Sequence, residues 1–356
     1  MAYTIPLLED IAATLLRNIS NQLPDADVGK DSDFAIRANA IASAVQGLYQ
    51  HQVWIVRQMF PDTADHDYLV MHARTRNLQP KPATYAGGKV QLTGNAGVAV
   101  KSGLQFRPKG SSLLCQTTED ATVGSDGKVA IAARPLETGT AGNLADNTPG
   151  TLLIAPEGID SDVTILRMTG GTDDETDASL LARLLEVIRR PAAGGNKYDY
   201  HRWAVEVPGV TEAYVYPLRR GYGTVDVVIV ANNSMPSEET IKATQVHIDD
   251  VRPVTAKNTL VLAPEEVITD VSVKVKLSGL SLDEARKQIT TAITDYFNRL
   301  APGEIAVLKQ IGGSITNIVG VIDYDFIKPT GNIIPVVDKT RVQWIRLGTV
   351  TVDKLP

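Results

Sequence analysis

The residues whose types could do chemistry gather first in an acidic run near the middle of the chain. Residues 170–177 read Gly-Gly-Thr-Asp-Asp-Glu-Thr-Asp and place four carboxylates within five residues. Such a run could bind Ca²⁺, but the EF-hand pattern counted from Asp173 requires Asp or Asn third, Gly sixth and Glu twelfth. Those positions hold Glu175, Ala178 and Leu184. The spacing therefore argues against an EF-hand calcium site.

The start of a helix explains the same acidic run better. Residues 177–190 have the leucine spacing of a helix face, with carboxylates before them and Arg189 and Arg190 at their end. Negative charge at the first turn and positive charge at the last turn both complement the helix dipole. We therefore expect a helix start here, and no metal.

Other potential catalytic residues lack the neighbours that chemistry requires. His66 and His72 lie roughly 240° apart around a helix, so they cannot share a metal on one face. Ser125 lies in Gly-Ser-Asp-Gly, which lacks the spacing of a serine nucleophile and is typical of a hairpin turn. Cys115, the only cysteine, follows two leucines and indicates a buried strand residue without a catalytic partner. The sequence has no phosphate-binding glycine loop either, so we expect no catalytic residue, no cofactor and no enzyme activity.

Aromatic and basic residues form a second cluster between residues 189 and 222. Arginine and aromatic side chains are the usual anchors of protein interfaces, and they also stack on single-stranded nucleic acid. A formal charge of −6 argues against nucleic acid, because phosphate binding normally needs a basic surface. We therefore predict core packing and a protein interface here. Its candidate contact residues are Arg189, Arg190, Trp203, Arg219, Arg220 and Tyr222.

Charge reversal within this cluster supplies a test. If Arg219 and Arg220 contact a partner, changing both to Glu should weaken partner binding and leave thermal stability nearly unchanged.

The elements that must position these residues begin with an N-terminal helical domain, residues 1–80. Its central helix repeats apolar residues every seven positions along a seam of roughly 39 Å at 1.5 Å per residue. One row holds Phe34, Ile41, Leu48 and Ile55, and the other holds Ala38, Val45 and Met59 with Gln52 as a polar exception. The seam is compatible with packing on the preceding helix, residues 6–22, or on another subunit.

Three further regions follow the helices. Residues 84–166 contain short apolar runs between turn residues, which predicts a small β-sandwich or barrel. Residues 170–235 are predicted as a central α/β region, with a continuous apolar strand near Val225 to Val230. Residues 236–356 are predicted as a C-terminal α+β domain, and the strand–helix order after residue 210 indicates ferredoxin-like layers. The expected fold class is therefore α+β and multidomain.

A weak internal repeat links the last two regions. Val207-Pro208-Gly209-Val210 and Ile318-Val319-Gly320-Val321 each follow a helical stretch and begin a strand. Two copies of a helix–turn–strand unit would explain this similarity, and so would chance.

The sequence also bears on localisation. No apolar run approaches the roughly 18–20 residues that span a bilayer, and Glu9 and Asp10 interrupt any signal-peptide core. We expect a protein that is synthesised and kept in the cytoplasm, without membrane insertion.

An ordered set of motifs resembles the baseplate J-like proteins of Mu-type contractile-tailed phages. The set comprises Arg76-Asn77-Leu78, Pro82–Gly88, Gly139–Asn143, Gly170–Asp177 with Arg183 and Arg189-Arg190-Pro191, Tyr200–Ala204, Val207–Val210, and Pro217 with Gly221–Val225. The first β loop, Val100–Gly103, departs from the hydrophobic-Pro-x-Gly-Thr turn common in the family. Past residue 235 the resemblance thins.

The resemblance implies a structural wedge subunit of the tail baseplate, assembled in the host cytoplasm and then resident in the virion. Its partners would be itself, other wedge proteins, and hub, spike and sheath-proximal proteins, and no catalysis is implied. Linkers at residues 80–82 and 191–195 would let rigid domains reorient when the ring changes state. A receptor- or carbohydrate-binding tail protein is the alternative, and the long N-terminal helical third argues against it.

Overall fold

The computed structural model describes residues 4–355 and divides the chain into two compact units. The helical unit comprises the chain up to Pro80 together with Thr176–Arg189, and the larger unit comprises Lys81–Glu175 and the chain from Arg190 onward. Across the residues described, no helix is long and apolar enough to cross a membrane.

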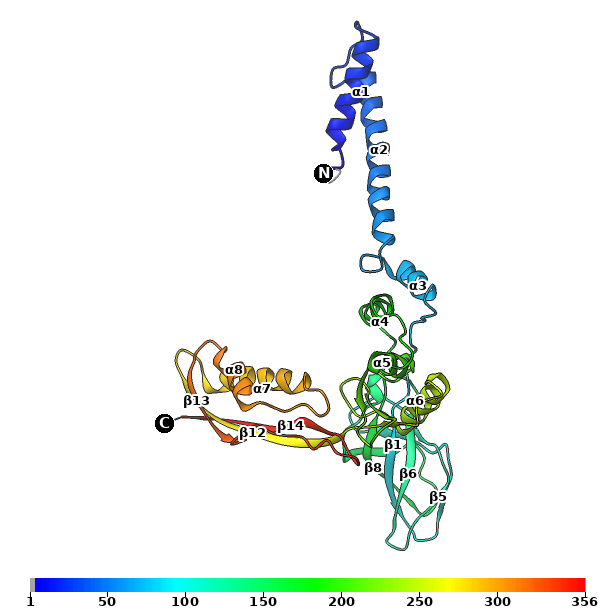
Figure 1. Ribbon diagram of the computed structural model, residues 1–356, viewed down its shortest axis with the longest axis vertical. Coiled ribbons are helices and arrows are strands. Elements are labelled where there is room, and N and C mark those ends of the chain that lie inside the picture. The colour runs from blue at the N-terminus through cyan, green and yellow to red at the C-terminus, as the bar shows by residue number, and fades with distance from the viewer. Residues whose placement is uncertain (1–3, 356) are drawn as a thin grey trace. The chain divides into compact units, whose positions relative to one another are not determined.

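The helical unit contains α1 (Leu8–Gln22), α2 (Asp33–Gln58), α3 (His66–Arg74) and α4 (Asp177–Arg189). α2 begins at Ser32, whose hydroxyl accepts a hydrogen bond from the Ala35 amide at 3.1 Å and satisfies a free N–H of the first turn. α1 lies beside the N-terminal half of α2 (Figure 1), where small alanines let the two helices approach closely.

α4 returns to the helical unit about 100 residues later in the chain than α3. Its apolar face packs on α3 in a small core of Leu69, Ala73, Leu78, Leu180 and Leu184. The helical domain expected for residues 1–80 is therefore discontinuous in sequence, because α4 completes its core.

Residues 87–169 form a closed six-stranded barrel, which decides between the two expected β architectures. Around the barrel the strands are β1 (Gly87–Gly94), β6 (Lys128–Pro135), β4 (Cys115–Thr117), β3 (Gln105–Pro108), β7 (Thr148–Leu152) and β8 (Ile159–Thr169). A short separate pair joins β2 (Ala99–Val100) to β5 (Ala121–Thr122). Alternate side chains fill the interior, including Val90, Leu92, Phe106, Ile131, Ile165 and Met168.

β8 was not anticipated, and the boundary expected at residue 166 falls inside it. Its apolar residues do not alternate strictly, because its pairing with β1 is shifted twice by bulges. The regular alternation of apolar and polar residues that indicates a strand in a sequence is therefore missing from β8.

The chain then builds two three-stranded mixed sheets, and helices pack on each of them as in the α+β layers expected for this part of the chain. The first has the order β11-β10-β9, with β9 (Glu212–Pro217) antiparallel and β11 (Asn258–Leu262) parallel to β10 (Thr224–Val230). α5 (Lys197–Glu206) and α6 (Glu238–Val251) pack on it. Because α6 packs on this sheet and β11 pairs with its central strand, the domain built on the sheet extends past the boundary expected near residue 235.

The second sheet has the order β13-β12-β14, with β13 (Val321–Lys328) antiparallel and β14 (Gln343–Lys354) parallel to β12 (Glu265–Leu277). α7 (Leu282–Asn298) and α8 (Leu308–Thr316) cover one face of it (Figure 1). The strand expected from alternating valines near residue 271 is β12.

The two repeated segments have the same local structure. Gly209 and Gly320 adopt φ of 89° and 99°. In each turn the amide of the last residue donates to the carbonyl of the first at 3.2 Å, from Val210 to Val207 and from Val321 to Ile318. Each turn leads from a helix into the edge strand that is antiparallel to the centre of its sheet, α5 into β9 and α8 into β13.

Candidate functional site

The C-terminal half of α2 presents an uncovered apolar surface. In the helical unit α1 covers Ala35, Ala38 and Ala42, which are buried, whereas Leu48 is 64% exposed. At 100° per residue the uncovered positions span an arc of about 160°. They are Leu48, Val53, Ile55 and Val56, and the exposed Met59 and Phe60 follow directly after the helix end at Gln58.

Of the predicted heptad row, only Phe34 is half-buried, and Ile41, Leu48 and Ile55 are exposed. The preceding helix therefore covers only the first part of the seam, since α1 has 15 residues and α2 has 26. We name the exposed set, together with Ile41, the α2 face.

The acidic run mostly serves another purpose than starting a helix. Asp173 accepts the amide and the hydroxyl of Thr140, each at 2.8 Å, and these bonds lower the pKa of its carboxyl. Asp174 accepts the Ala83 amide at 2.9 Å, and Glu175 accepts the Lys81 amide at 3.0 Å. These three carboxylates bind loop backbone, which corrects the dipole interpretation for them.

The helix-start interpretation holds for Asp177, the acidic residue in the first turn of α4. Its carboxylate also contacts His66 Nδ1 at 2.6 Å, and this hydrogen bond raises the pKa of the imidazole. His72, the other histidine considered for a metal, contacts the Gln58 carbonyl at 2.8 Å. Within residues 4–355 no three His, Cys, Asp or Glu side chains group in a way that could hold a metal ion.

Three of the motifs that carry the family resemblance meet at one place in the larger unit. The Thr84 amide donates to the Thr172 carbonyl at 2.9 Å, and the Gly139 amide donates to the Thr84 carbonyl at 3.0 Å. Asn143 and Gly171 exchange two hydrogen bonds of 2.9 Å each. We call the assembly of Lys81–Thr84, Gly139–Asn143 and Gly170–Glu175 the motif junction.

Close backbone approach explains the glycines of the junction. A Cβ added at Gly171 would lie 2.4 Å from the Gly139 carbonyl oxygen, which no side chain tolerates. Lys81 then links the junction to the β11-β10-β9 sheet and its helices, which we call the middle sheet. The Lys81 ammonium donates to the carbonyls of Val205 and Val210 at 3.0 and 2.7 Å. Segments up to 129 residues apart in sequence are thus held together by hydrogen bonds to backbone groups.

The Arg/Tyr cluster does not form one surface. Asp226 is fully buried, and its carboxylate takes Arg219 Nε at 2.6 Å and Arg220 Nε at 2.8 Å. Arg219 also donates to the Asp338 carbonyl at 2.5 Å, which ties the β9–β10 hairpin to the C-terminal sheet domain. The strand interpreted as continuously apolar therefore contains one charge.

This pairing overturns the expectation that reversing Arg219 and Arg220 would spare stability. The side chain of Arg219 is only 5% exposed. Two glutamates there would face the buried Asp226 and repel it.

The remaining members of the cluster divide between packing and exposure. Trp203 packs edge-on against buried Tyr200 with ring centroids 5.0 Å apart. The Arg190 guanidinium lies over the Tyr198 ring at 4.3 Å, and Arg189 ends α4 in the helical unit. Tyr222, at the hairpin tip, is 92% exposed and is the cluster's most accessible ring.

The glycine-rich link at residues 191–195 is anchored. Asp199 is buried, and its carboxylate accepts the amides of Ala193, Gly195 and Asn196 at 3.1, 2.7 and 3.2 Å. The pKa of this carboxyl lies below its usual value, because these amide bonds outweigh the effect of burial. The link therefore does not have the freedom expected of a flexible linker.

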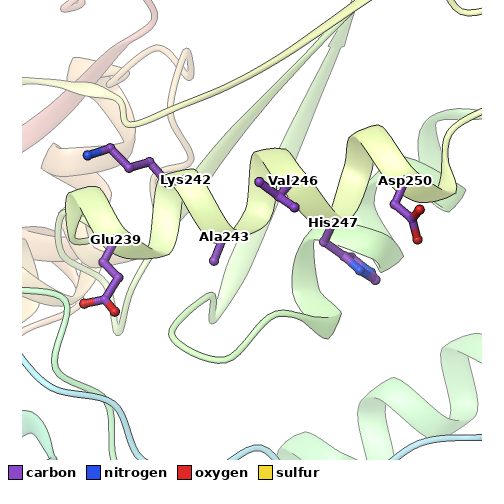
Figure 2. A pocket seen from close by; sticks show the side chains of 6 residues that line it. All are labelled: Glu239, Lys242, Ala243, Val246, His247 and Asp250. Atoms are coloured by element: carbon purple, nitrogen blue, oxygen red, sulfur yellow. The ribbon is translucent and has the colours of Figure 1, made fainter.

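A recess lies along one face of α6, as Figure 2 shows. Its lining residues Glu239, Lys242, Ala243, Val246, His247 and Asp250 all come from this one helix. His247 Nε2 contacts Glu206 at 3.0 Å, which ties α6 to α5. Catalytic groups normally converge on a point from several elements, and these side chains lie in a row.

The sequence did not single out Asp226, Asp199 or Lys81. A signal existed for Asp226, because one carboxylate inside Val225–Val230 must be paired if the strand is buried. No such signal marks Lys81, whose acceptors are carbonyls more than 120 residues away.

Comparison with known proteins agrees with this architecture. Three family models match the chain: the baseplate J-like barrel domain over residues 89–171, the central domain over 192–263 and the C-terminal domain over 269–353. The barrel and the two sheets described above correspond to these matches.

Relatives align over nearly the whole chain. The chain is 30% identical over 345 residues to baseplate protein gp47 of Escherichia phage Mu, covering 93% of this chain and 95% of that protein. It is 31% identical over 308 residues to the Mu-like prophage FluMu protein gp47 of Haemophilus influenzae, covering 83% and 86%. It is 29% identical over 336 residues to the phage-like element PBSX protein XkdT of Bacillus subtilis, covering 91% of each.

Among solved structures, a chain of the anti-feeding prophage baseplate covers 95% of this chain and 90% of its own length, at 12% identity and a TM-score of 0.39. That similarity is too low to support an argument. The family models match the barrel and both sheets, and the Mu protein aligns along nearly the whole chain. The chain therefore belongs to the baseplate J-like family of non-enzymatic, structural baseplate proteins.

Proposed function

We propose that this protein is a wedge subunit of the baseplate of a contractile phage tail or tail-like particle. In this role copies of the chain form a ring around the hub and spike, and the ring couples host contact to sheath contraction. The proposal places the chain in the assembled tail, after synthesis in the host cytoplasm. Family membership supports the baseplate, and the α2 face supports a role in assembly.

The α2 face is the observation on which the proposal depends most. Exposed apolar surface of this extent on a helix marks a protein interface. An arc of about 160° is wider than the two-row seam of a paired coiled coil, so more than one neighbouring helix is needed to cover it. These neighbours would be helices of a second copy or of another wedge protein.

A single charge in the middle of this face tests the proposal. Leu48→Glu places a carboxylate where apolar side chains must pack, and we expect it to abolish assembly with co-expressed baseplate proteins. The monomer should stay folded, because Leu48 is 64% exposed and makes little contribution to the core of the helical unit. Size-exclusion chromatography with light scattering measures assembly, and circular dichroism measures helix content.

Gln50→Glu is the matched control. Gln50 is also exposed and lies two residues on, about 200° around the helix from Leu48, so the same charge there should leave assembly intact. Normal assembly of the Leu48→Glu variant would show that the face is not an interface.

Tyr222 remains the candidate for a second protein contact. It lies at the tip of a hairpin whose Arg219 and Arg220 bind the buried Asp226. An exposed aromatic side chain on an anchored hairpin is a favourable interface anchor, since less backbone entropy is lost when it binds. This contact would involve a different neighbour from that of the α2 face.

A further inference from the structure

The polypeptide crosses between the helical unit and the larger unit at three points. The crossings follow Pro80, Glu175 and Arg189. Any change in orientation between the two units must be absorbed at or near these crossings. What holds each crossing on the side of the larger unit therefore decides where the chain can bend.

The first two crossings are bound to each other. Lys81 and Glu175 exchange backbone contact, since the Glu175 amide donates to the Lys81 carbonyl at 3.0 Å and the Lys81 amide donates to the Glu175 carboxylate at 3.0 Å. Asp174 holds the Ala83 amide, and Asp173 holds Thr140 on a separate loop of the barrel. Hydrogen bonds to a carboxylate are roughly twice as strong as those between neutral groups.

The third crossing has an equivalent anchor. Asp199 binds three amides of residues 193–196, and Arg202 adds a bond to Asp199 at 3.1 Å and one to the Arg190 carbonyl at 3.4 Å. At each passage into the larger unit, a carboxylate thus binds backbone amides near the crossing.

We propose that Asp173, Asp174 and Glu175 form a carboxylate clasp that fixes to the barrel the residues at which the chain enters and leaves the larger unit, so that the chain bends only outside the clasp. Bending is confined to the residues outside the clasp, before Lys81 and after Glu175. In this view the acidic run is a mechanical fixture. The proposal concerns the chain by itself and does not require any partner.

Hydrogen exchange of the full-length protein tests the clasp. In the double variant Asp174→Ala with Glu175→Ala, the amides of Lys81 and Ala83 lose their carboxylate acceptors and should exchange about tenfold faster or more. In Asp173→Ala the same increase should appear at the Thr140 amide. Exchange in α2 and α7 should not change in either variant.

Asp146→Ala is the matched control, because Asp146 is an exposed carboxylate on the same barrel. It should leave exchange unaltered throughout. Unchanged exchange at the amides of Lys81, Ala83 and Thr140 in the clasp variants would overturn the proposal. An equal increase in α7 would also overturn it, since the carboxylates would then serve only global stability.

A distance measurement tests whether the clasp limits where the chain bends. Spin labels at Arg74→Cys in α3 and Ser125→Cys on a barrel turn report the spread of distances between the two units by pulsed electron resonance. Both sites are exposed, whereas Cys115 is buried and burial raises the pKa of its thiol to about 11, so it will not compete for the label.

The clasp variants should broaden the distance distribution, and Asp146→Ala should not. An equally narrow distribution in the clasp variants would show that the clasp does not control orientation. Because neither measurement includes a partner, failure here is distinguishable from failure of the proposed wedge function.

Discussion

Asp226 shows how one buried carboxylate changes the role of two arginines. It lies with no exposed surface on the central strand of the middle sheet, and Arg219 and Arg220 neutralise it from the hairpin beside it. Even so, Arg219 Nη2 is buried and has no hydrogen-bond partner among the described residues. Arg219 therefore compensates the buried carboxylate without satisfying all of its own donors.

Arg219→Ala should lower the free energy of unfolding by about 3 kcal/mol, because it removes one of the two partners of a buried charge. Thermal or urea denaturation of the isolated protein measures this change. Arg341→Ala is the control, since its ion pair with Glu265 is about half-exposed and should contribute less than about 1 kcal/mol. A loss at Arg219 as small as that at Arg341 would contradict the role assigned to Asp226.

Residue types in the sequence indicated which groups could act, and the fold determined which of them do. The absence of a nucleophile or ligand pattern was readable, because those chemistries need fixed spacings. The partners of Asp173 and Asp226 were not readable, because a carboxylate binds a distant backbone amide as readily as a cation. Long-range pairing of this kind leaves no periodic signal.

At the scale of elements, helices and central strands were predictable and one barrel strand was not. The heptads of α2 and the valine alternation of β12 follow a regular period, and a capping serine marks the start of α7. β8 does not, since bulges interrupt its alternation. The mixed topology of the two sheets could not be predicted from the sequence either, because parallel and antiparallel edge strands have similar composition.

The repeated helix–turn–strand unit leads to a prediction at this scale. Gly320→Ala should lower the free energy of unfolding by about 1–3 kcal/mol, since φ of 99° is strained for any side chain. The added methyl would also lie 2.8 Å from the Leu280 Cβ. Denaturant titration measures the change.

Gly331→Ala is the control for this prediction. A Cβ at Gly331 meets nothing within 4 Å and its φ is not left-handed. It should be neutral or slightly stabilising, as expected for a glycine that can accept alanine. Equal effects at the two sites would mean that the turn is not constrained.

At the scale of the whole molecule, the core of the helical unit depends on two separate parts of the chain. Leu180 and Leu184 of α4 are buried only because Leu69, Ala73 and Leu78 cover them. Removing the residues up to Pro80 should therefore expose an apolar face and cause aggregation, which light scattering measures. Changing Leu180 and Leu184 to Gln in the truncated chain should restore a monodisperse protein.

A truncated chain that is monodisperse without these changes would contradict this prediction. It would mean that α4 does not depend on the N-terminal helices for cover. The sequence alone did not reveal this dependence, because a gap of about 100 residues between α3 and α4 conceals that they share a core.

The same gap has a consequence for synthesis. At about 5–20 residues per second, the ribosome needs about 5–20 s after finishing α3 before α4 follows it. During that interval Leu69 and Leu78 have emerged without the leucines that later shield them. The nascent helical segment thus exposes apolar side chains while the barrel is still being translated. A chaperone or a neighbouring nascent chain can bind these side chains during that time.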